Sequence, residues 1–259
     1  MIGIFDSGVG GMTVARALEN RLPGVPYIYF GDLARAPYGP KSPETITEYA
    51  RENTRFLIEQ GARLIVIACN SAASVAADLI KAEFPVPVFE VIGPAVKEAV
   101  AASRSGRIGV IGTRATVRSN VYDRKIAAAA PEARVFSTAC PLLVPLVEEG
   151  WFNRRETKMI VRSYLHSLKL KKVDTLVLGC THYPLLRQLI QPRIGKNVRI
   201  IDSSDAVAAE LADFLAANPS LAAKLETGES SRYYASDITE AARATAKSIF
   251  GRRIEMIKL

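Results

Sequence analysis

Short apolar runs that end in glycine, aspartate, asparagine or cysteine alternate along this chain with longer segments of helical period, and this alternation constrains the fold most. Short strands that alternate with helices are typical of α/β proteins with largely parallel sheets. Strands are predicted over residues 2–5, 27–30, 64–68, 86–91, 108–112, 134–137, 175–178 and 198–201. Helices are predicted over residues 43–60, 71–83, 94–103, 116–130, 154–168 and 206–217.

Two stretches of the chain share one layout. Residues 64–71 (LIVIACNS) and 175–182 (TLVLGCTH) each consist of an apolar strand, a small residue, a cysteine and polar side chains that open a helix. A weaker match relates residues 2–7 (IGIFDS) to residues 108–113 (IGVIGT). Two lobes of similar build are implied, each a mostly parallel sheet flanked by helices. Because ligands bind beyond the carboxyl ends of such strands, the active site is expected in a cleft between the lobes.

Composition narrows the class of protein. The 259 residues, 49% of them hydrophobic, can bury one sizeable core or two smaller ones. No apolar run reaches the roughly 20 residues of a membrane span, and no secretory leader is recognisable, so a soluble cytoplasmic protein without membrane contact is expected. The net charge of +8 comes from Lys and Arg interleaved with Asp and Glu. The densest cluster, Lys169 to Lys172, is interpreted as a solvated helix end, and no nucleic-acid partner is predicted.

Cysteines are the residues most suggestive of chemistry. Three of them cannot form the disulfide scaffold of a secreted domain, so reduced thiols are expected. Cys69 or Cys180 alone would be interpreted as an ordinary buried thiol, but their matched strand-tip settings favour a functional pair. Two thiols that face each other across a cleft can remove a proton from one face of a carbon and return one to the other, which is racemisation. Cys140, followed by Pro141, is interpreted as structural.

Polar side chains accompany the two cysteines. The donors that could hold a carboxylate at the helix starts are Asn70, Ser71, Thr181 and His182. Helix capping explains Ser71 and Thr181 equally well. Asp6 ends the first strand, where it could form a turn, bind a substrate ammonium or orient a thiol. His182 is a candidate for proton handling beside Cys180.

Two cofactor hypotheses are disfavoured. The glycines within residues 8–11 suggest a dinucleotide-binding loop, but Thr13 occupies the last glycine position and Asp6 would repel a pyrophosphate. A zinc site is the other alternative, with suitable ligand types in Cys69, Cys180, His182 and Asp6. The chain has no compact Cys-x-x-Cys pair to support it. Neither a cofactor nor a metal is therefore predicted.

Five ordered blocks of sequence carry a family resemblance. They are IFDSGVGGMT at residues 4–13, APYGP at 36–40, ACNSA at 68–72, VPLVE at 144–148 and GCTHY at 179–183. Over nearly its whole length the chain closely resembles the glutamate racemase family of the aspartate and glutamate racemase superfamily. The resemblance implies a cofactor-independent racemase that interconverts L-glutamate and D-glutamate and, in bacteria, supplies D-glutamate for peptidoglycan.

The same resemblance implies an organisation into lobes. Residues 1–93 and 206–259 would form the first α/β lobe, and residues 94–205 the second, with the active site between them. A homodimer is compatible with the resemblance, and the sequence leaves the oligomeric state open.

Roles for individual residues also follow from the resemblance. Cys69 would take the proton from D-glutamate and Cys180 from L-glutamate, with Asp6, Glu148 and His182 as supporting acids and base. The implied substrate contacts are Asp6, Ser7, Tyr38, Gly39, Asn70, Ser71, Thr181 and His182. Ser71 stands where threonine is commoner in the family, and it keeps the hydroxyl. Glu149 adjoins Glu148, so the choice between these two carboxylates stays open.

Other functions compete with this one. A relative with another substrate is one alternative, such as an aspartate racemase, a hydantoin racemase or a decarboxylase that uses one thiol. The block at residues 6–11 and the presence of both cysteines argue against these. A two-lobed binding protein would share the cleft but would need no thiols, and only turnover separates it from a racemase.

Overall fold

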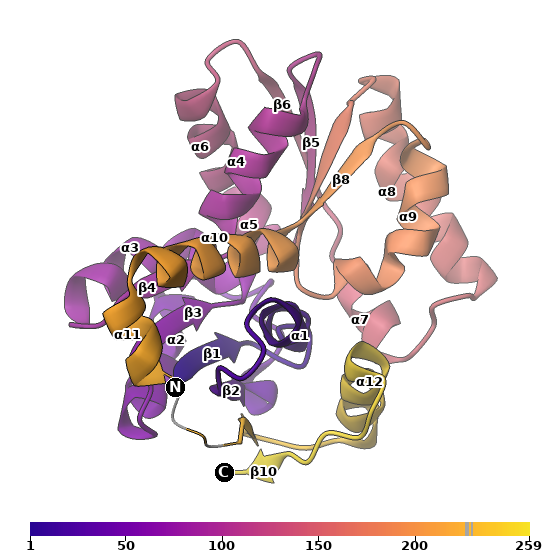
Figure 1. Ribbon diagram of the computed structural model, residues 1–259. Coiled ribbons are helices and arrows are strands. Elements are labelled where there is room, and N and C mark those ends of the chain that lie inside the picture. The colour runs from indigo at the N-terminus through magenta and orange to yellow at the C-terminus, as the bar shows by residue number, and fades with distance from the viewer. Residues whose placement is uncertain (226–227, 229) are drawn as a thin grey trace.

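Two parallel sheets form the framework of the protein (Figure 1). The structure is a computed structural model, which describes residues 1–225, 228 and 230–259. The first sheet has the order β10-β9-β2-β1-β3-β4 and the second β6-β5-β7-β8, and all of their strand pairs are parallel. The first sheet contains β1 (Ile2–Asp6), β2 (Tyr27–Gly31), β3 (Leu64–Ile67), β4 (Val88–Glu90), β9 (Arg232–Ala235) and β10 (Ile257–Lys258). The second contains β5 (Arg107–Gly112), β6 (Arg134–Ala139), β7 (Thr175–Gly179) and β8 (Arg199–Asp202). The predicted α/β class with two sheets is confirmed.

Helices cover both sheets. Near the first sheet, α2 (Pro43–Glu59) packs on α3 (Asn70–Glu83), and α1 (Met12–Arg21) packs on α10 (Ser203–Ala217). Near the second, α8 (Arg155–Leu170) packs on α9 (Arg187–Ile194), and α4 (Ile92–Ala102) packs on α6 (Val121–Ala129). The remaining helices are α5 (Arg114–Arg118), α7 (Leu143–Glu148), α11 (Pro219–Leu225) and α12 (Glu240–Phe250), with short 3-10 turns at Leu33–Arg35 and Tyr183–Leu186.

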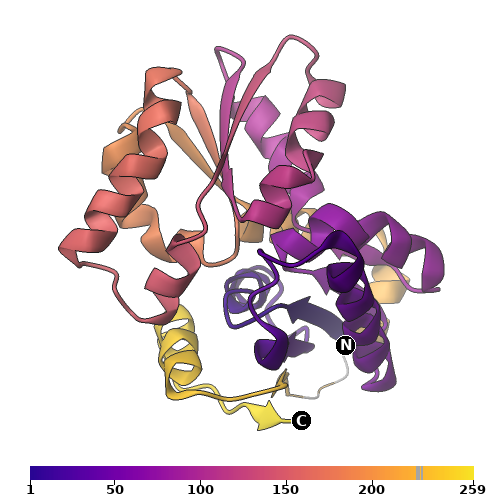
Figure 2. The same ribbon diagram turned by 180° about the vertical axis from the view of Figure 1, so that it is seen from behind.

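Two helices link the lobes. Helix α10 contacts both α1 and α4, and it runs between the two sheets (Figure 1). On the other side, the yellow C-terminal helix α12 reaches α7 (Figure 2). The lobes are therefore held on two sides of the space into which their strands point.

The strand predictions hold, and one helix prediction needs correction. Each of the eight predicted strands is present, whereas the short strands β9 and β10 were not predicted. The single helix predicted over residues 116–130 is two helices, α5 and α6. They are separated at Asn120, whose φ of 53° lies in the left-handed region and interrupts the helical path.

The carboxyl ends of the strands meet between the lobes. Cys69 follows β3 and Cys180 follows β7, in each case at the turn into the next helical segment. Hydrogen bonds cross the cleft from one set of strand ends to the other, such as that from the Thr181 hydroxyl to the Asp6 carboxylate. Among the residues that the structure describes, no helix is both long and apolar enough to cross a membrane.

Candidate active site

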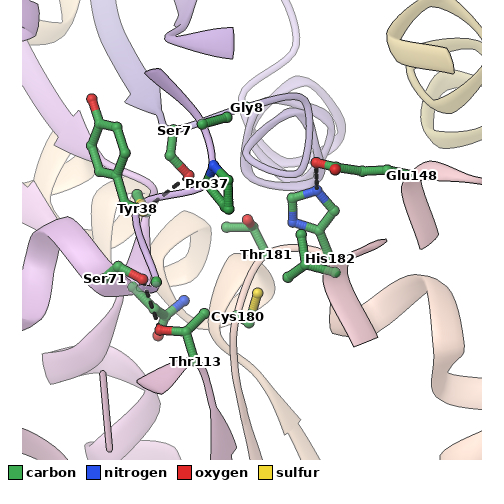
Figure 3. Close-up of a pocket in the computed structure, with 15 residues that line it drawn as sticks. Ser7, Gly8, Pro37, Tyr38, Ser71, Thr113, Glu148, Cys180, Thr181 and His182 are labelled. Atoms are coloured by element: carbon green, nitrogen blue, oxygen red, sulfur yellow. Dashed lines mark hydrogen bonds and ion pairs between the residues drawn. The ribbon is translucent and has the colours of Figure 1, made fainter. Parts of the chain in front are cut away.

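A small pocket lies between the carboxyl ends of the two sheets (Figure 3). Both cysteines of the predicted pair line it. The other predicted site residues that line it are Ser7, Tyr38, Gly39, Asn70, Ser71, Glu148, Thr181 and His182. Asp6 does not line the pocket but contacts residues that do. Residues separated by more than a hundred positions are thus brought into one small volume.

Cys69 lines the pocket on the side of the first sheet. It is 4% exposed, and its thiol donates a hydrogen bond to the Ser7 hydroxyl, with 3.6 Å between the two atoms. Burial, with a smaller contribution from the charge of Asp6, raises the pKa of the Cys69 thiol to about 12. Cys69 is therefore a neutral thiol near neutral pH, a group able to give up a proton.

Cys180 lies on the opposite side, next to a charged histidine. The His182 imidazole forms a hydrogen bond with the Cys180 sulfur, and its Nε2 lies 3.1 Å from Glu148 Oε1. Burial opposes the charging of His182, but Cys180 and Glu148 together outweigh it and raise the pKa of His182 to about 10. The ring packs against Gly10, where a Cβ would lie 2.3 Å from His182 Nδ1, so only glycine leaves room for it.

Asp6 forms hydrogen bonds with pocket-lining residues of both lobes. It is 1% exposed and accepts hydrogen bonds from the Gly8 backbone N–H at 2.9 Å and from the Thr181 hydroxyl at 3.2 Å. Burial raises the pKa of Asp6, against the opposing charge of His182. Asp6 therefore ties the loop after β1 to the turn after β7.

The two neighbouring glutamates differ in whether they line the pocket that holds the thiols. Glu148, at the end of α7, contacts His182 and lines the pocket, as Figure 3 shows. Glu149 lines a groove beside α12 that Glu148 also lines, but it does not line the pocket that holds the thiols. Of the two carboxylates between which the sequence could not choose, Glu148 is the one beside the thiols.

Tyr38 lines the pocket, but its hydroxyl points away from it (Figure 3). Its phenol donates a hydrogen bond to Asp32 and accepts one from Asn53 Nδ2 at 3.0 Å, so it is occupied on the side away from the pocket (Figure 3). The adjacent Gly39 packs closely on Thr113, because a Cβ there would lie 2.9 Å from the Thr113 Cβ.

Thr113 is the polar pocket residue that was not predicted from the sequence. Its hydroxyl lies 2.8 Å from the Ser71 hydroxyl, which joins the two lobes at the edge of the pocket (Figure 3). A signal was present, since the match between residues 2–7 and 108–113 pairs Thr113 with Ser7. Gly8, Ala36, Pro37 and Val144 complete the lining. Within the described part of the chain, no group of three or more His, Cys, Asp or Glu side chains is arranged to hold a metal ion.

The fold and the site define a class, namely two-lobed α/β proteins with two thiols facing one polar cleft. Residues 12–211 match the family described as Asp/Glu/Hydantoin racemase. A glutamate racemase of Syntrophus aciditrophicus is 51% identical over 214 residues, covering 83% of this chain and 79% of the relative. That of Aquifex aeolicus is 47% identical over 254 residues, covering 98% and 95%.

Solved structures agree. A Bacillus anthracis glutamate racemase is similar with a TM-score of 0.93 and 33% identity, covering 100% of this chain and 97% of the other. A Francisella tularensis glutamate racemase in complex with D-glutamate has a TM-score of 0.90 and 34% identity, covering 100% and 96%. The chain belongs to the Asp/Glu/Hydantoin racemase family and, within it, to the glutamate racemases. The family predicted from the sequence is confirmed.

Proposed function

We propose that this protein interconverts L-glutamate and D-glutamate without a cofactor, by proton transfer between the substrate and two thiols, Cys69 and Cys180. The observation that carries the proposal is the presence of both thiols in one buried pocket, on matched turns of opposite lobes. The relatives support the substrate, since solved glutamate racemases are described in complex with D-glutamate and with L-glutamate.

The unequal surroundings of the two thiols suit this chemistry. A protonated His182 places a positive charge beside the Cys180 sulfur and so stabilises a thiolate, which can remove the α-proton of L-glutamate. Cys69, held neutral by burial, is then the acid that returns a proton to the opposite face. In the reverse direction the roles exchange, and Cys69 takes the proton of D-glutamate.

The developing carbanion needs stabilisation by the protein. Without an electron-sink cofactor, donors around the substrate carboxylate must supply it. Asn70 and Ser71 begin α3, and Thr181 follows Cys180, so the backbone N–H groups of these residues are suited to that carboxylate as its charge develops. Glu148 supplies negative charge for His182, and Asp6 holds Thr181 in place through its hydroxyl.

The proposal extends to cellular role and organisation. D-glutamate made here would supply peptidoglycan synthesis in the cytoplasm, and the chain would act as a homodimer. The first lobe would comprise residues 1–93 and 206–259, and the second residues 94–205. The membership of the two sheets supports that division, since strands at 2–90 and 232–258 form one sheet and strands at 107–202 the other.

Circular dichroism of L-glutamate in deuterated water tests the proposal. The signal should decay to zero with no added cofactor while deuterium enters the α-position, and L-aspartate should change far more slowly. Cys69→Ser should abolish interconversion, whereas Cys140→Ala, which alters a buried thiol outside the pocket, should keep it. A constant signal with the unaltered protein, or full activity of Cys69→Ser, would overturn the proposal.

A further inference from the structure

Asn70 is held by two residues that lie outside the pocket. It follows Cys69 directly, is 2% exposed and lines the pocket. The Tyr122 hydroxyl donates to Asn70 Oδ1 at 2.7 Å, and Asn70 Nδ2 donates to the Ser203 hydroxyl oxygen at 3.3 Å. Both ends of one buried amide are thus bound by groups that do not line the cavity.

The directions of these hydrogen bonds determine the orientation of the amide. Ser203 donates its only hydroxyl hydrogen to the Leu178 carbonyl at 3.2 Å, so its oxygen is left to accept from Asn70. Burial raises the pKa of the Tyr122 phenol well above its ordinary value, so this group keeps its proton and can donate. The amide oxygen must therefore face Tyr122 and the amide nitrogen Ser203. One N–H of Asn70 remains for a ligand in the pocket.

Tyr122 also touches the turn that carries the other thiol. It is 1% exposed, and its ring lies against Gly179, where a Cβ would lie 3.2 Å from Tyr122 Cε2. Gly179 is the residue directly before Cys180, and Asn70 is the residue directly after Cys69. Through one side chain, α6 therefore contacts both cysteine-bearing turns.

We infer that Tyr122 is a positioning residue of this site, which together with Ser203 fixes the Asn70 amide so that its free N–H is presented to the substrate carboxylate. The inference rests on the proposed racemase function. Without the phenol hydroxyl, the buried Oδ1 of Asn70 loses its partner, and the amide is free to turn or to shift. Tyr122 does not line the pocket, and its hydroxyl bonds to Asn70, so the effect of losing that hydroxyl passes through Asn70.

Tyr122→Phe separates this role from a purely structural one. An amide that binds the substrate carboxylate equally in the ground state and the transition state affects KM and not kcat. We expect KM for both enantiomers to rise about 10-fold, with kcat within about 3-fold of the unaltered protein. The matched control is Tyr27→Phe, which removes a buried phenol bonded to Tyr233 at 2.6 Å, at the start of β2 and away from the pocket. It should lower thermal stability and leave KM unchanged.

A double-mutant cycle tests whether the effect passes through Asn70. In the Asn70→Ala background, Tyr122→Phe should raise KM by less than about 2-fold, because the group that it positions is gone. Multiplicative effects, or an unchanged KM in a natively folded Tyr122→Phe variant, would overturn the inference. If Tyr122→Phe fails to fold, Ser203→Ala tests the inference instead. It removes the acceptor of the Asn70 Nδ2 hydrogen bond and should also raise KM.

Direct binding distinguishes this inference from the proposed function. If the unaltered protein bound D-glutamate by calorimetry but did not racemise it, the proposed function would be wrong. The ratio of Kd values for Tyr122→Phe and the unaltered protein would still test whether Tyr122 positions Asn70. The positioning role predicts a Kd about 10-fold higher for Tyr122→Phe, and an equal Kd would contradict it.

Discussion

His182 shows most clearly how single residues make the two sides of the pocket unequal. It is 4% exposed, yet hydrogen bonds to Cys180 and Glu148 raise its pKa to about 10, so it is charged near neutral pH. Cys69, across the pocket, has a pKa raised to about 12 and stays neutral. The sequence presents two cysteines in matched settings, and the structure shows that their surroundings differ in charge. In the proposed mechanism, one thiol therefore acts as the base and the other as the acid.

Glu148→Gln should lower the pKa of His182, because it removes the negative charge that helps to hold the proton. The alkaline limb of the pH profile for L-glutamate should then move down by about one pH unit, and turnover at pH 9.5 should fall about 3-fold. Initial rates across pH and NMR titration of the imidazole would measure this. Glu149→Gln, which changes the adjacent carboxylate outside the pocket that holds the thiols, should match the unaltered protein. Equal effects of the two variants would contradict the assignment.

At the scale of elements, the break between α5 and α6 is the main departure from the predicted pattern. The helical period continues through residues 116–130, but Asn120 adopts a φ of 53° and redirects the chain. This places Tyr122 in the first turn of α6, from which its hydroxyl reaches Asn70. Periodicity could not predict the break, since asparagine is compatible with both a helix and a turn.

Asn120→Ala should destabilise the protein by about 1 kcal/mol, because a Cβ without a polar group disfavours the left-handed conformation. Asn120→Gly is the matched control and should be neutral or slightly stabilising, since glycine adopts this conformation freely. Urea unfolding curves would compare the three proteins. An Ala variant as stable as the Gly variant would contradict this account of the break.

At the scale of the whole molecule, the chain leaves the first sheet after β4, builds the second, and returns through α10 to add β9 and β10. Such a path depends on turns that hold the inserted sheet together. One of these turns is held by Asp174, whose carboxylate accepts hydrogen bonds from Ser103, from the Arg104 backbone and from Ser105. It joins the turn before β5 to the start of β7. The cluster Lys169 to Lys172 lies exposed nearby, at and after the end of α8, as a solvated helix end would.

Acid unfolding should depend on Asp174. Burial would raise the pKa of Asp174, but the hydrogen bonds from Ser103 to Ser105 outweigh it and lower the pKa to about 2. Its stabilisation is therefore complete above the unfolded pKa of about 4 and is lost as the pH falls through about 2. Asp174→Asn should cost about 1 kcal/mol at pH 7, discounted for solvent screening because the side chain is only partly buried, and almost nothing at pH 2.

Thermal unfolding across pH would measure this loss. The control is Asp78→Asn, which removes the same charge from an exposed position on α3 and should leave the pH dependence unchanged. A cost for Asp174→Asn that stays constant from pH 7 to pH 2 would show that the charge of Asp174 is not the source of the stabilisation.

The sequence alone determined eight strands of the two sheets, the pairing of Cys69 with Cys180 and the family, because short apolar runs, strand-tip motifs and ordered blocks are local properties of the chain. Only the tertiary structure decided that Glu148 rather than Glu149 meets His182, that the Tyr38 hydroxyl is occupied by Asp32, and that Thr113 and Tyr122 join the lobes. Each of these depends on which side chains meet when two sheets close on one cleft. Contacts across the cleft are set by packing between distant segments, and no local pattern encodes them.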